Sequence, residues 1–249
     1  FEMGAPEDTQ FHLCVYHARF PLAQRAAIEQ QLDTALNRRD ETAVFKDPDI
    51  RRALEQTTAT HHLFIVLASP VCEVGRDWDA DWAIAEPSSM RALVQLAGRV
   101  QRHRQQPNGR ANLVIFDTNL RHFDNNRGPD GKPAAIFVRP GFEQERVAAN
   151  HPFRLVAHRL GKLMRADEYQ TIDALPRVAP RPAAERQPKT HLVDLEHVRM
   201  ADTMQPISAD ATRRLNAASA WQYPQSMLTG VLAQQQPFRD NTMRTVQLV

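Results

Sequence analysis

The apolar residues of the first 120 positions recur with two different periods. Four short apolar runs are rich in residues that favour β-strands, namely 12–16, 62–67, 82–85 and 112–116. Two intervening segments, 21–38 and 89–103, instead repeat their apolar residues every three or four positions, as helices do. Between them, Asp47 and Pro48 predict the start of a shorter helix that runs to about residue 56. Strands that alternate with helices predict an α/β fold, with a parallel sheet covered on both faces.

The pattern changes after residue 117. Residues 118–142 are rich in glycine, proline and asparagine, which is typical of a long connection. Over 153–165 the apolar residues form one helical stripe, and four basic residues follow the opposite face: Arg154, His158, Lys162 and Arg165. Such a face suits a DNA backbone or an acidic partner, although a solvated surface has the same composition.

Proline marks the next change in the chain. Four prolines between 176 and 188 indicate a stiff linker, and helical patterns follow at 192–200 and 209–221. Trp221 and Tyr223 end the last of these patterns, where core packing is a simpler role for them than base stacking. We therefore expect three regions: an α/β lobe over 1–120, a connection with a basic helix and the linker over 121–189, and a helical C-terminal region over 190–249.

The charge of the chain is informative in its distribution rather than in its sum. With 31 basic and 29 acidic residues the net charge is +2, which does not by itself indicate nucleic-acid binding. Between residues 87 and 116, however, there is no acid, and five arginines occur: Arg91, Arg99, Arg102, Arg104 and Arg110. This basic stretch attracts phosphate groups, although a solvated surface is again the common alternative.

The chain has the composition of a protein of the cytoplasm. Its two cysteines, Cys14 and Cys72, lie far apart in apolar stretches, and no Cys/His spacing predicts a zinc site. No run approaches the 18 or so apolar residues of a membrane span, so no membrane partner is expected. The first residues have neither the basic start nor the apolar run of a signal peptide. We expect the chain to be part of a longer product.

The most informative stretch is the eight-residue segment Gln95–Arg102. On a helix, Gln95, Arg99 and Arg102 fall on one side, and four apolar residues fall on the other: Met90, Leu93, Ala97 and Val100. Arginine binds phosphate oxygens in pairs and keeps its charge. An arginine that contacts a transferring phosphoryl group is worth roughly 10³–10⁵ in rate. The segment therefore predicts two guanidinium groups that project together toward a triphosphate, whereas the neighbouring His103 and Arg104 are expected at the surface.

This segment, Gln-x-x-Gly-Arg-x-x-Arg, resembles the sixth motif of superfamily 2 helicases. The preceding Ser69–Asp77 is similar to the fifth motif, with Ser69 in place of the usual threonine. Three further stretches resemble the helicase–nuclease of type I CRISPR systems, subtype I-F, in which it is fused to an adaptation subunit: 16–20, 79–82 and 86–90. The resemblance covers residues 12–117 well and the remainder loosely.

The resemblance implies a fold and a set of roles. The fold is the second, RecA-like motor lobe, incomplete at its N-terminus and followed by a mostly helical extension. The implied catalytic residues are Arg102 and Arg99. The implied ATP-binding residues are Gln95, Gly75 and Asp77. The implied DNA-binding residues are His17, Arg19 and Ser69. ATP and Mg²⁺ are expected to be bound mainly by the first motor lobe, and a further divalent metal by the nuclease domain, both outside this chain.

The implied function is ATP-dependent movement along single-stranded DNA, coupled to a nuclease that degrades foreign DNA. The implied partners are single-stranded DNA, the CRISPR RNA-guided surveillance complex and the adaptation integrase. Two alternatives stay open on the sequence. One is a superfamily 2 helicase that acts on RNA or in repair. The other is a non-catalytic docking module that binds the surveillance complex or an inhibitor protein through residues 118–249.

Two patterns look like sites but do not fit their chemistry. Residues 128–132 contain a Gly-Pro-Asp-Gly-Lys turn, but the spacing is too short for a phosphate loop, and Pro133 stands where a hydroxyl residue is needed. Asp77, Asp79 and Asp81 alternate in a short loop, which does not make a metal cage. We expect Asp79 and Asp81 to cap turns or to pair with arginines, and we predict no metal site.

We predict that the 249-residue chain alone neither hydrolyses ATP nor cleaves DNA. Its sequence contains no usable phosphate loop, and it has no His-Asp dipeptide of the kind that binds metal in the family's nuclease domain. The purified chain should therefore release phosphate from ATP at the rate of buffer alone, with or without single-stranded DNA. ATP hydrolysis that is abolished by Arg102→Ala in this chain would contradict the prediction.

Overall fold

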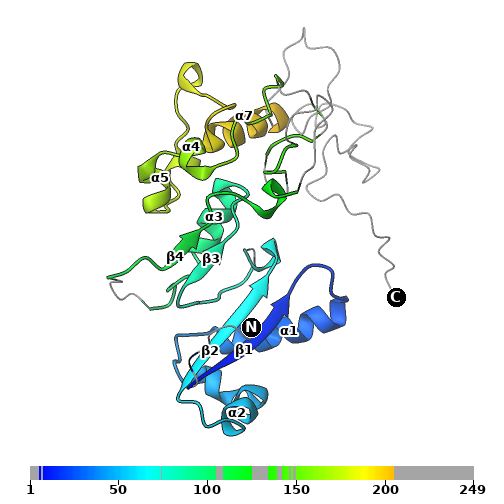
Figure 1. The fold of residues 1–249 in the computed structure, drawn as a ribbon, viewed down its shortest axis with the longest axis vertical. Helices are drawn as coiled ribbons and strands as arrows, with labels where there is room; N and C mark the ends of the chain where they lie inside the picture. Colours follow the sequence, from blue (N-terminus) through cyan, green and yellow to red (C-terminus); the bar gives the residue numbers. More distant parts are fainter. Residues whose placement is uncertain are drawn as a thin grey trace. The chain divides into compact units, whose positions relative to one another are not determined.

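The computed structural model describes residues 6, 8–73, 75–104, 109–124, 134–138, 142–145, 147 and 150–204 (Figure 1). The chain divides into two compact units. Unit 1 comprises residues 1–85 and 94–115, and unit 2 comprises residues 86–93 and 116–249. The expected domain boundaries at residues 120 and 189 stay predictions, and the helix expected over 209–221, with Trp221 and Tyr223, lies outside the described residues.

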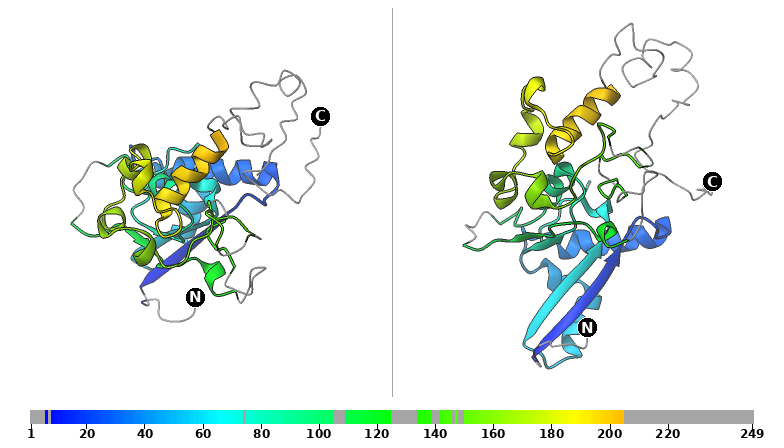
Figure 2. Two further views of the ribbon diagram at one scale, coloured as in Figure 1. Left: turned by 90° about the horizontal axis from the view of Figure 1, so that it is seen from above. Right: turned by 45° about the horizontal axis from the view of Figure 1, so that its top comes forward.

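Unit 1 is a mixed α/β structure with parallel strands. Strands β1 (Thr9–Tyr16) and β2 (His61–Ala68) pair in parallel over eight residues and lie side by side in Figure 1 and in the right-hand view of Figure 2. Strands β3 (Ala83–Ala85) and β4 (Leu113–Ile115) form a second parallel pair. The predicted α/β class with parallel strands is thus confirmed. Among the described residues, however, the strands form two two-stranded sheets rather than one covered sheet.

The helices of unit 1 begin where the sequence indicates. Helix α1 (Leu22–Ala35) follows Pro21, and α2 (Pro48–Glu55) follows Asp47. The carboxylate of Asp47 accepts the backbone N–H groups of Asp49 and Ile50, at 2.9 and 3.0 Å, which satisfies two of the donors that a helix start leaves free. The described residues of the unit also form two short 3₁₀ turns, Ala43–Lys46 and Pro70–Glu73.

The core of unit 1 lies between the β1–β2 pair and α1. Tyr16, Leu32 and Trp78 are buried there, with six partly buried residues packed around them: Cys14, Ile28, Leu36, Val66, Val71 and Cys72. The Tyr16 hydroxyl donates to Glu29 on α1 at 2.6 Å. Burial and this hydrogen bond raise the pKa of Tyr16 to about 12. The polar contact therefore fixes the end of β1 against α1.

Helix α3 (Met90–Ala97) begins in unit 2 and ends in unit 1. The Ser89 hydroxyl accepts the backbone N–H of Ala92 at 3.1 Å and caps the helix. The carboxylate of Glu196 accepts the N–H of Met90 from a position 106 residues later in the chain. Two groups within unit 2 therefore satisfy the free donors at this helix start.

The described residues of unit 2 form four further helices, α4 (Leu160–Leu163), α5 (Ala166–Gln170), α6 (Leu175–Val178) and α7 (Leu192–Met204). Two 3₁₀ turns accompany them, Leu120–His122 and Ala183–Glu185. Helix α7 confirms the helical pattern that begins at residue 192 and extends it by four residues.

The prediction of a single basic helix over 153–165 is wrong. The N–H of Val156 bonds to the carbonyl of Lys189, and the N–H of Leu160 bonds to the carbonyl of Asp117. These distant acceptors take donors that a continuous helix would need, so only α4 forms there. Arg154 is buried and lies 3.5 Å from Glu143, so it does not belong to a solvated basic face.

Glu196 is a buried acid in α7 whose titration depends on burial. Loss of hydration raises its pKa to about 7, although the N–H of Met90 and the charge of Arg177 act in the opposite direction. The folded state therefore holds this proton more tightly than the unfolded chain, whose reference pKa is 4.5. Stability from this group is full below about pH 4.5 and is lost as the pH rises through about 7.

We predict that Glu196→Gln gains stability over the parent as the pH rises. Glutamine keeps an acceptor for Met90 but carries no titrating proton, so the difference between variant and parent should grow between pH 5 and pH 8, by up to about 3 kcal/mol. Urea unfolding at both pH values measures this difference. The exposed Glu185→Gln is the control and should give a constant difference. A constant or shrinking difference for Glu196→Gln would refute the account.

Candidate functional site

The segment 76–79 lies at the centre of the candidate site in unit 1, and its side chains alternate between two neighbours. Arg76 pairs with Glu29 and, at 2.8 Å, with Asp33, both on α1. The indole N–H of Trp78 donates to Asp33 at 2.6 Å. The two carboxylates that alternate with them, Asp77 and Asp79, instead bind residues 102–104. The segment thus joins α1 to the residues that follow α3.

Asp77 gathers three donors at the surface of unit 1. Its carboxylate accepts Nε of Arg102 at 2.6 Å, Nη2 of Arg39 at 2.7 Å and Nε2 of His103 at 3.1 Å. These hydrogen bonds hold the pKa of Asp77 below its ordinary range, and the one from His103 has the largest effect. The Asp77 and Arg102 side chains are each 46% exposed, so water screens the pair and its net contribution to stability is small. Arg102 can therefore exchange this partner for another anion at little cost.

Asp79 is the buried counterpart of Asp77. It accepts the backbone N–H groups of Arg102 and His103, each at 3.1 Å, and two N–H groups of the Arg104 guanidinium at 2.9 and 3.0 Å. Burial alone would raise the pKa of Asp79, but the bonds from Arg104 and His103 outweigh it and lower the pKa. Arg104 also pairs with Asp81, which in turn lies 3.3 Å from Arg38. The expectation that Asp79 and Asp81 pair with arginines is confirmed.

His103 and Arg104 are not surface residues, contrary to expectation. Their side chains are only 2% and 17% exposed. Both turn inward because their partners, Asp77 and Asp79, lie in one short segment beside them. Sequence reasoning missed these partners, although the alternation of charge in 76–79 is a signal that could have indicated two contact faces.

The sequence predicted that Arg99 and Arg102 project together from one helix, but they follow the end of α3. Helix α3 ends at Ala97, and Val100 then forms a parallel bridge with Ala80. Ala80 donates to the carbonyl of Arg99 at 2.8 Å and accepts from Gln101 at 2.9 Å. Gln101 has a φ of 50°, in the left-handed region, which changes the direction of the chain after this bridge. The motif therefore lies on a helix end and the turn after it, which we call the arginine turn (residues 98–104).

Two groups of the predicted ATP site have buried polar atoms that need a partner. Arg99 donates through Nη2 to the carbonyl of Glu73 at 3.3 Å, but its Nε has no hydrogen bond among the described residues. The Oε1 of Gln95 is also buried and lacks a hydrogen bond within the part of the chain that the structure describes. Burial and the nearby charge of Arg102 lower the pKa of Arg99. An anion beside Arg99 would take up this Nε donor and offset the charge of Arg102, so Arg99 fits a phosphate group, whereas the Oε1 of Gln95 is an acceptor and needs a hydroxyl or amino donor.

The three residues predicted to bind DNA lie together at the carboxyl ends of β1 and β2. Ser69 follows β2, and its Oγ accepts the N–H of Ala18 at 3.3 Å. His17 accepts the N–H of Arg19 through Nδ1 at 3.1 Å and stacks on Phe20, with ring centroids 4.0 Å apart. The carboxyl ends of parallel strands are a common place for ligand sites.

The 3₁₀ turn Pro70–Glu73 connects this group to the arginine turn. It begins directly after Ser69, and its last residue, Glu73, offers its carbonyl to Arg99. Gly75 then adopts a φ of 75°, which a residue without a side chain reaches without strain. A Cβ at Gly75 would meet nothing within 4 Å, so the backbone conformation rather than space requires glycine there.

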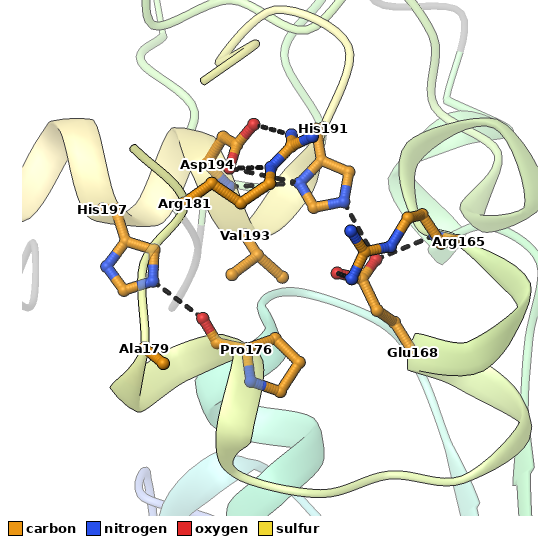
Figure 3. Close-up of a pocket in the computed structure, with 9 residues that line it drawn as sticks. All are labelled: Arg165, Glu168, Pro176, Ala179, Arg181, His191, Val193, Asp194 and His197. Atoms are coloured by element: carbon orange, nitrogen blue, oxygen red, sulfur yellow. Dashed lines mark hydrogen bonds and ion pairs between the residues drawn. The ribbon is translucent and has the colours of Figure 1, made fainter. Parts of the chain in front are cut away.

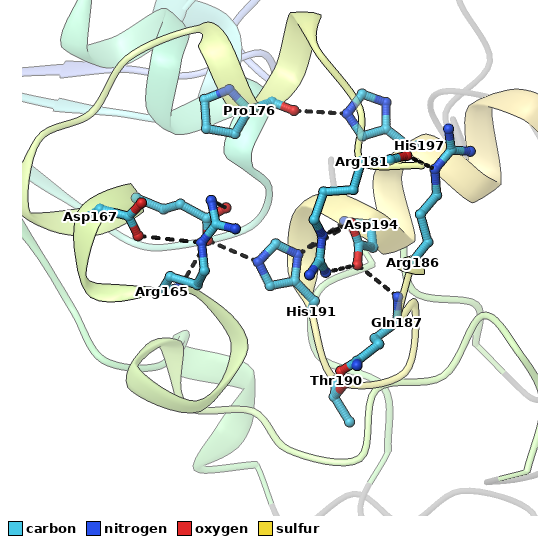
Figure 4. A network of polar contacts seen from close by, with 11 residues as sticks. Arg165, Asp167, Pro176, Arg181, Arg186, Gln187, Thr190, His191, Asp194 and His197 are labelled. Atoms are coloured by element: carbon cyan, nitrogen blue, oxygen red, sulfur yellow. Dashed lines mark hydrogen bonds and ion pairs between the residues drawn. The ribbon is translucent and has the colours of Figure 1, made fainter. Parts of the chain in front are cut away.

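Unit 2 has a small pocket of about 40 Å³ beside α7 (Figure 3). His191 bonds to Glu168 at 2.9 Å (Figure 3) and lies 3.6 Å from Asp194, whose carboxylate pairs with Arg181 (Figure 4). Arg165 pairs with Glu168 at 3.3 Å. The charged residues of the pocket therefore neutralise one another, which makes it a structural network that binds the proline-rich stretch to α7.

Two classes of feature are absent from the described residues. No group of three or more His, Cys, Asp or Glu side chains there is arranged to hold a metal ion. Nor does any helix in this part of the chain have the length and apolar character needed to cross a membrane.

Comparisons with known proteins identify the relatives of the chain. Residues 2–105 match the family described as CRISPR-associated nuclease/helicase Cas3, C-terminal. The Cas3 subtype I-F/YPEST protein of Pseudomonas aeruginosa (strain UCBPP-PA14) is 45% identical over 239 residues, which cover 95% of this chain and 20% of that protein. The chain matches the C-terminal part of Cas3 nuclease/helicase proteins. The predicted resemblance to the subtype I-F helicase–nuclease is thereby confirmed.

A second subtype I-F/YPEST relative, from Pectobacterium atrosepticum (strain SCRI 1043), is 38% identical over 244 residues, 95% of this chain and 21% of that protein. The chain thus spans about a fifth of the length of these Cas3 relatives. The solved structure described as T. fusca Cas3-ATP is 24% identical and covers 41% of this chain and 10% of that one, with a TM-score of 0.28, too low to support an argument. The names favour the CRISPR interpretation over an RNA or repair helicase.

Proposed function

We propose that the chain is part of the second, RecA-like motor lobe, with its C-terminal extension, of an ATP-dependent single-stranded DNA translocase. In this proposal the motor is coupled to a nuclease that degrades foreign DNA in type I CRISPR interference. The observation that carries the proposal is the arginine turn. It presents Arg102 in a half-exposed ion pair and Arg99 with a buried Nε that has no hydrogen bond within the described part of the chain.

The chemistry of these two guanidinium groups suits phosphoryl transfer. Charge develops on the oxygens around the transferring phosphorus, and a fixed arginine stabilises that charge without giving up a proton. Arg102 would leave Asp77 for the γ-phosphate, and Arg99 would donate through its Nε. Gln95, with its buried Oε1, and Asp77 and Gly75 would lie beside the nucleotide. ATP and Mg²⁺ would be bound mainly by the first motor lobe of the family, and a divalent metal by its nuclease domain.

The DNA strand would lie at the carboxyl ends of β1 and β2. His17, Arg19 and Ser69 offer donors there that bind phosphate and read no bases. The turn Pro70–Glu73 supports coupling, because it runs from Ser69 to the carbonyl that Arg99 contacts. In the cell, the surveillance complex would deliver the DNA in the cytoplasm, and the adaptation integrase would be a further partner.

We expect Arg102→Ala, in the full-length protein, to lower kcat for DNA-stimulated ATP hydrolysis by at least about 100-fold, because it removes charge stabilisation in the transition state. The KM for ATP should change much less. Arg99→Ala should lower kcat as well. Steady-state phosphate release measures both constants, and the exposed Arg110→Ala is the matched control. A kcat for Arg102→Ala within twofold of the parent would contradict the proposal.

Arg19→Gln should weaken single-stranded DNA binding through the loss of one phosphate contact. The slope of log affinity against log salt concentration should become shallower by about 0.7, the value for one contact to a single strand. Fluorescence anisotropy with a labelled oligonucleotide at several salt concentrations gives the slope. Arg51→Gln, on the exposed side of α2, is the control of equal charge change. A slope that Arg19→Gln leaves unchanged removes this residue from the DNA site.

A further inference from the structure

The Asp79 carboxylate has a complete set of hydrogen bonds in a fully buried position. Its Oδ1 accepts the N–H of Arg102 and Nη2 of Arg104, and its Oδ2 accepts the N–H of His103 and Nε of Arg104. The residue is 0% exposed. Each oxygen thus uses both of its lone-pair directions, and no direction is left for a nucleotide or a metal. The geometry gives Asp79 no direct contact with a substrate.

The four donors of Asp79 all come from the last three residues of the arginine turn. Two of them are backbone groups, so Asp79 fixes the path of the main chain at residues 102 and 103 rather than a side chain alone. The guanidinium of Arg104 supplies the positive charge that a buried carboxylate requires. The bridge between Ala80 and Val100 holds the other end of the same turn.

This arrangement determines where the Arg102 side chain begins. Its Nε lies 2.6 Å from Asp77, and its Nη1 donates to the carbonyl of Gly98 at 3.2 Å, so the guanidinium is directed by groups on both sides. A change in the backbone at residue 102 would displace all of these contacts together. Since a misplacement of 1 Å can cost two orders of magnitude in rate, the backbone anchor matters for catalysis.

We propose that Asp79 is a positioning residue for phosphoryl transfer, which acts by holding the backbone from which Arg102 projects. The inference rests on the proposed function of Arg102. This role differs from that of Asp77, whose carboxylate contacts the Arg102 guanidinium directly. Asp81 provides a natural comparison, because it also pairs with Arg104 but, among the described residues, accepts no backbone N–H from the arginine turn, and its side chain is 58% exposed.

The first test is Asp79→Asn in the full-length protein. Asparagine has nearly the same size, but its amide has one acceptor oxygen where two backbone N–H groups and a guanidinium need two. We expect kcat for DNA-stimulated ATP hydrolysis to fall at least tenfold, with the KM for ATP within threefold of the parent. The control Asp81→Asn should keep kcat within twofold. A parent-like kcat for Asp79→Asn overturns the inference.

A double-variant comparison separates positioning from general damage to the fold. If Asp79 acts through Arg102, then Asp79→Asn introduced into Arg102→Ala should lower the residual kcat by less than twofold. Losses that multiply overturn the inference, because a structural lesion would slow both backgrounds equally. An unchanged rate for Arg102→Ala alone instead overturns the proposed function, and with it the catalytic role of Asp79.

A milder variant covers the case in which Asp79→Asn melts below the assay temperature. Arg104→Lys keeps a positive charge beside Asp79 but loses the paired hydrogen bonds of the guanidinium. It should lower kcat at least threefold when Arg102 is present and have no further effect in Arg102→Ala. No loss in the first background, or an equal loss in both, overturns the inference.

Discussion

A buried carboxylate cannot remain charged without partners, and this constraint organises the candidate site. Asp79 has no exposed surface, and its pKa is nevertheless low because Arg104 and two backbone N–H groups surround it. To satisfy Asp79, the chain after α3 has to turn away from the helix axis. The same turn places Arg99, whose Nε finds no acceptor among the residues that the structure describes, and Arg102, which contacts Asp77 at the surface.

The constraint extends from Asp79 to the core of unit 1. Arg76 and Trp78, on either side of Asp77, are bound to α1, and the Trp78 ring packs edge-on against Tyr16 at 5.6 Å. The two acids that face the arginine turn are therefore placed by contacts made on the opposite side of their own segment. Through Tyr16 these contacts reach the end of β1, where the proposed DNA residues begin.

Local features of the fold could be predicted from the sequence, and distant ones could not. The strands, the Asp47 cap and the start of α1 depend on neighbouring residues, which explains why the patterns indicated them. The end of α3 depends on Ala80, and the loss of the helix over 153–165 depends on carbonyls of Asp117 and Lys189. The spacing of the motif identified the two arginines. It did not predict how they are positioned, because the acids that position them lie about 25 residues earlier in the chain.

Hydrogen exchange at the amides of Arg102 and His103 tests the central claim most directly. If Asp79 holds both groups, these neighbouring amides should exchange slowly and at similar rates, and both should lose protection in Asp79→Asn while the amides of α1 keep theirs. Rapid exchange at either amide in the parent protein would contradict the account. So would protection that survives the replacement of Asp79.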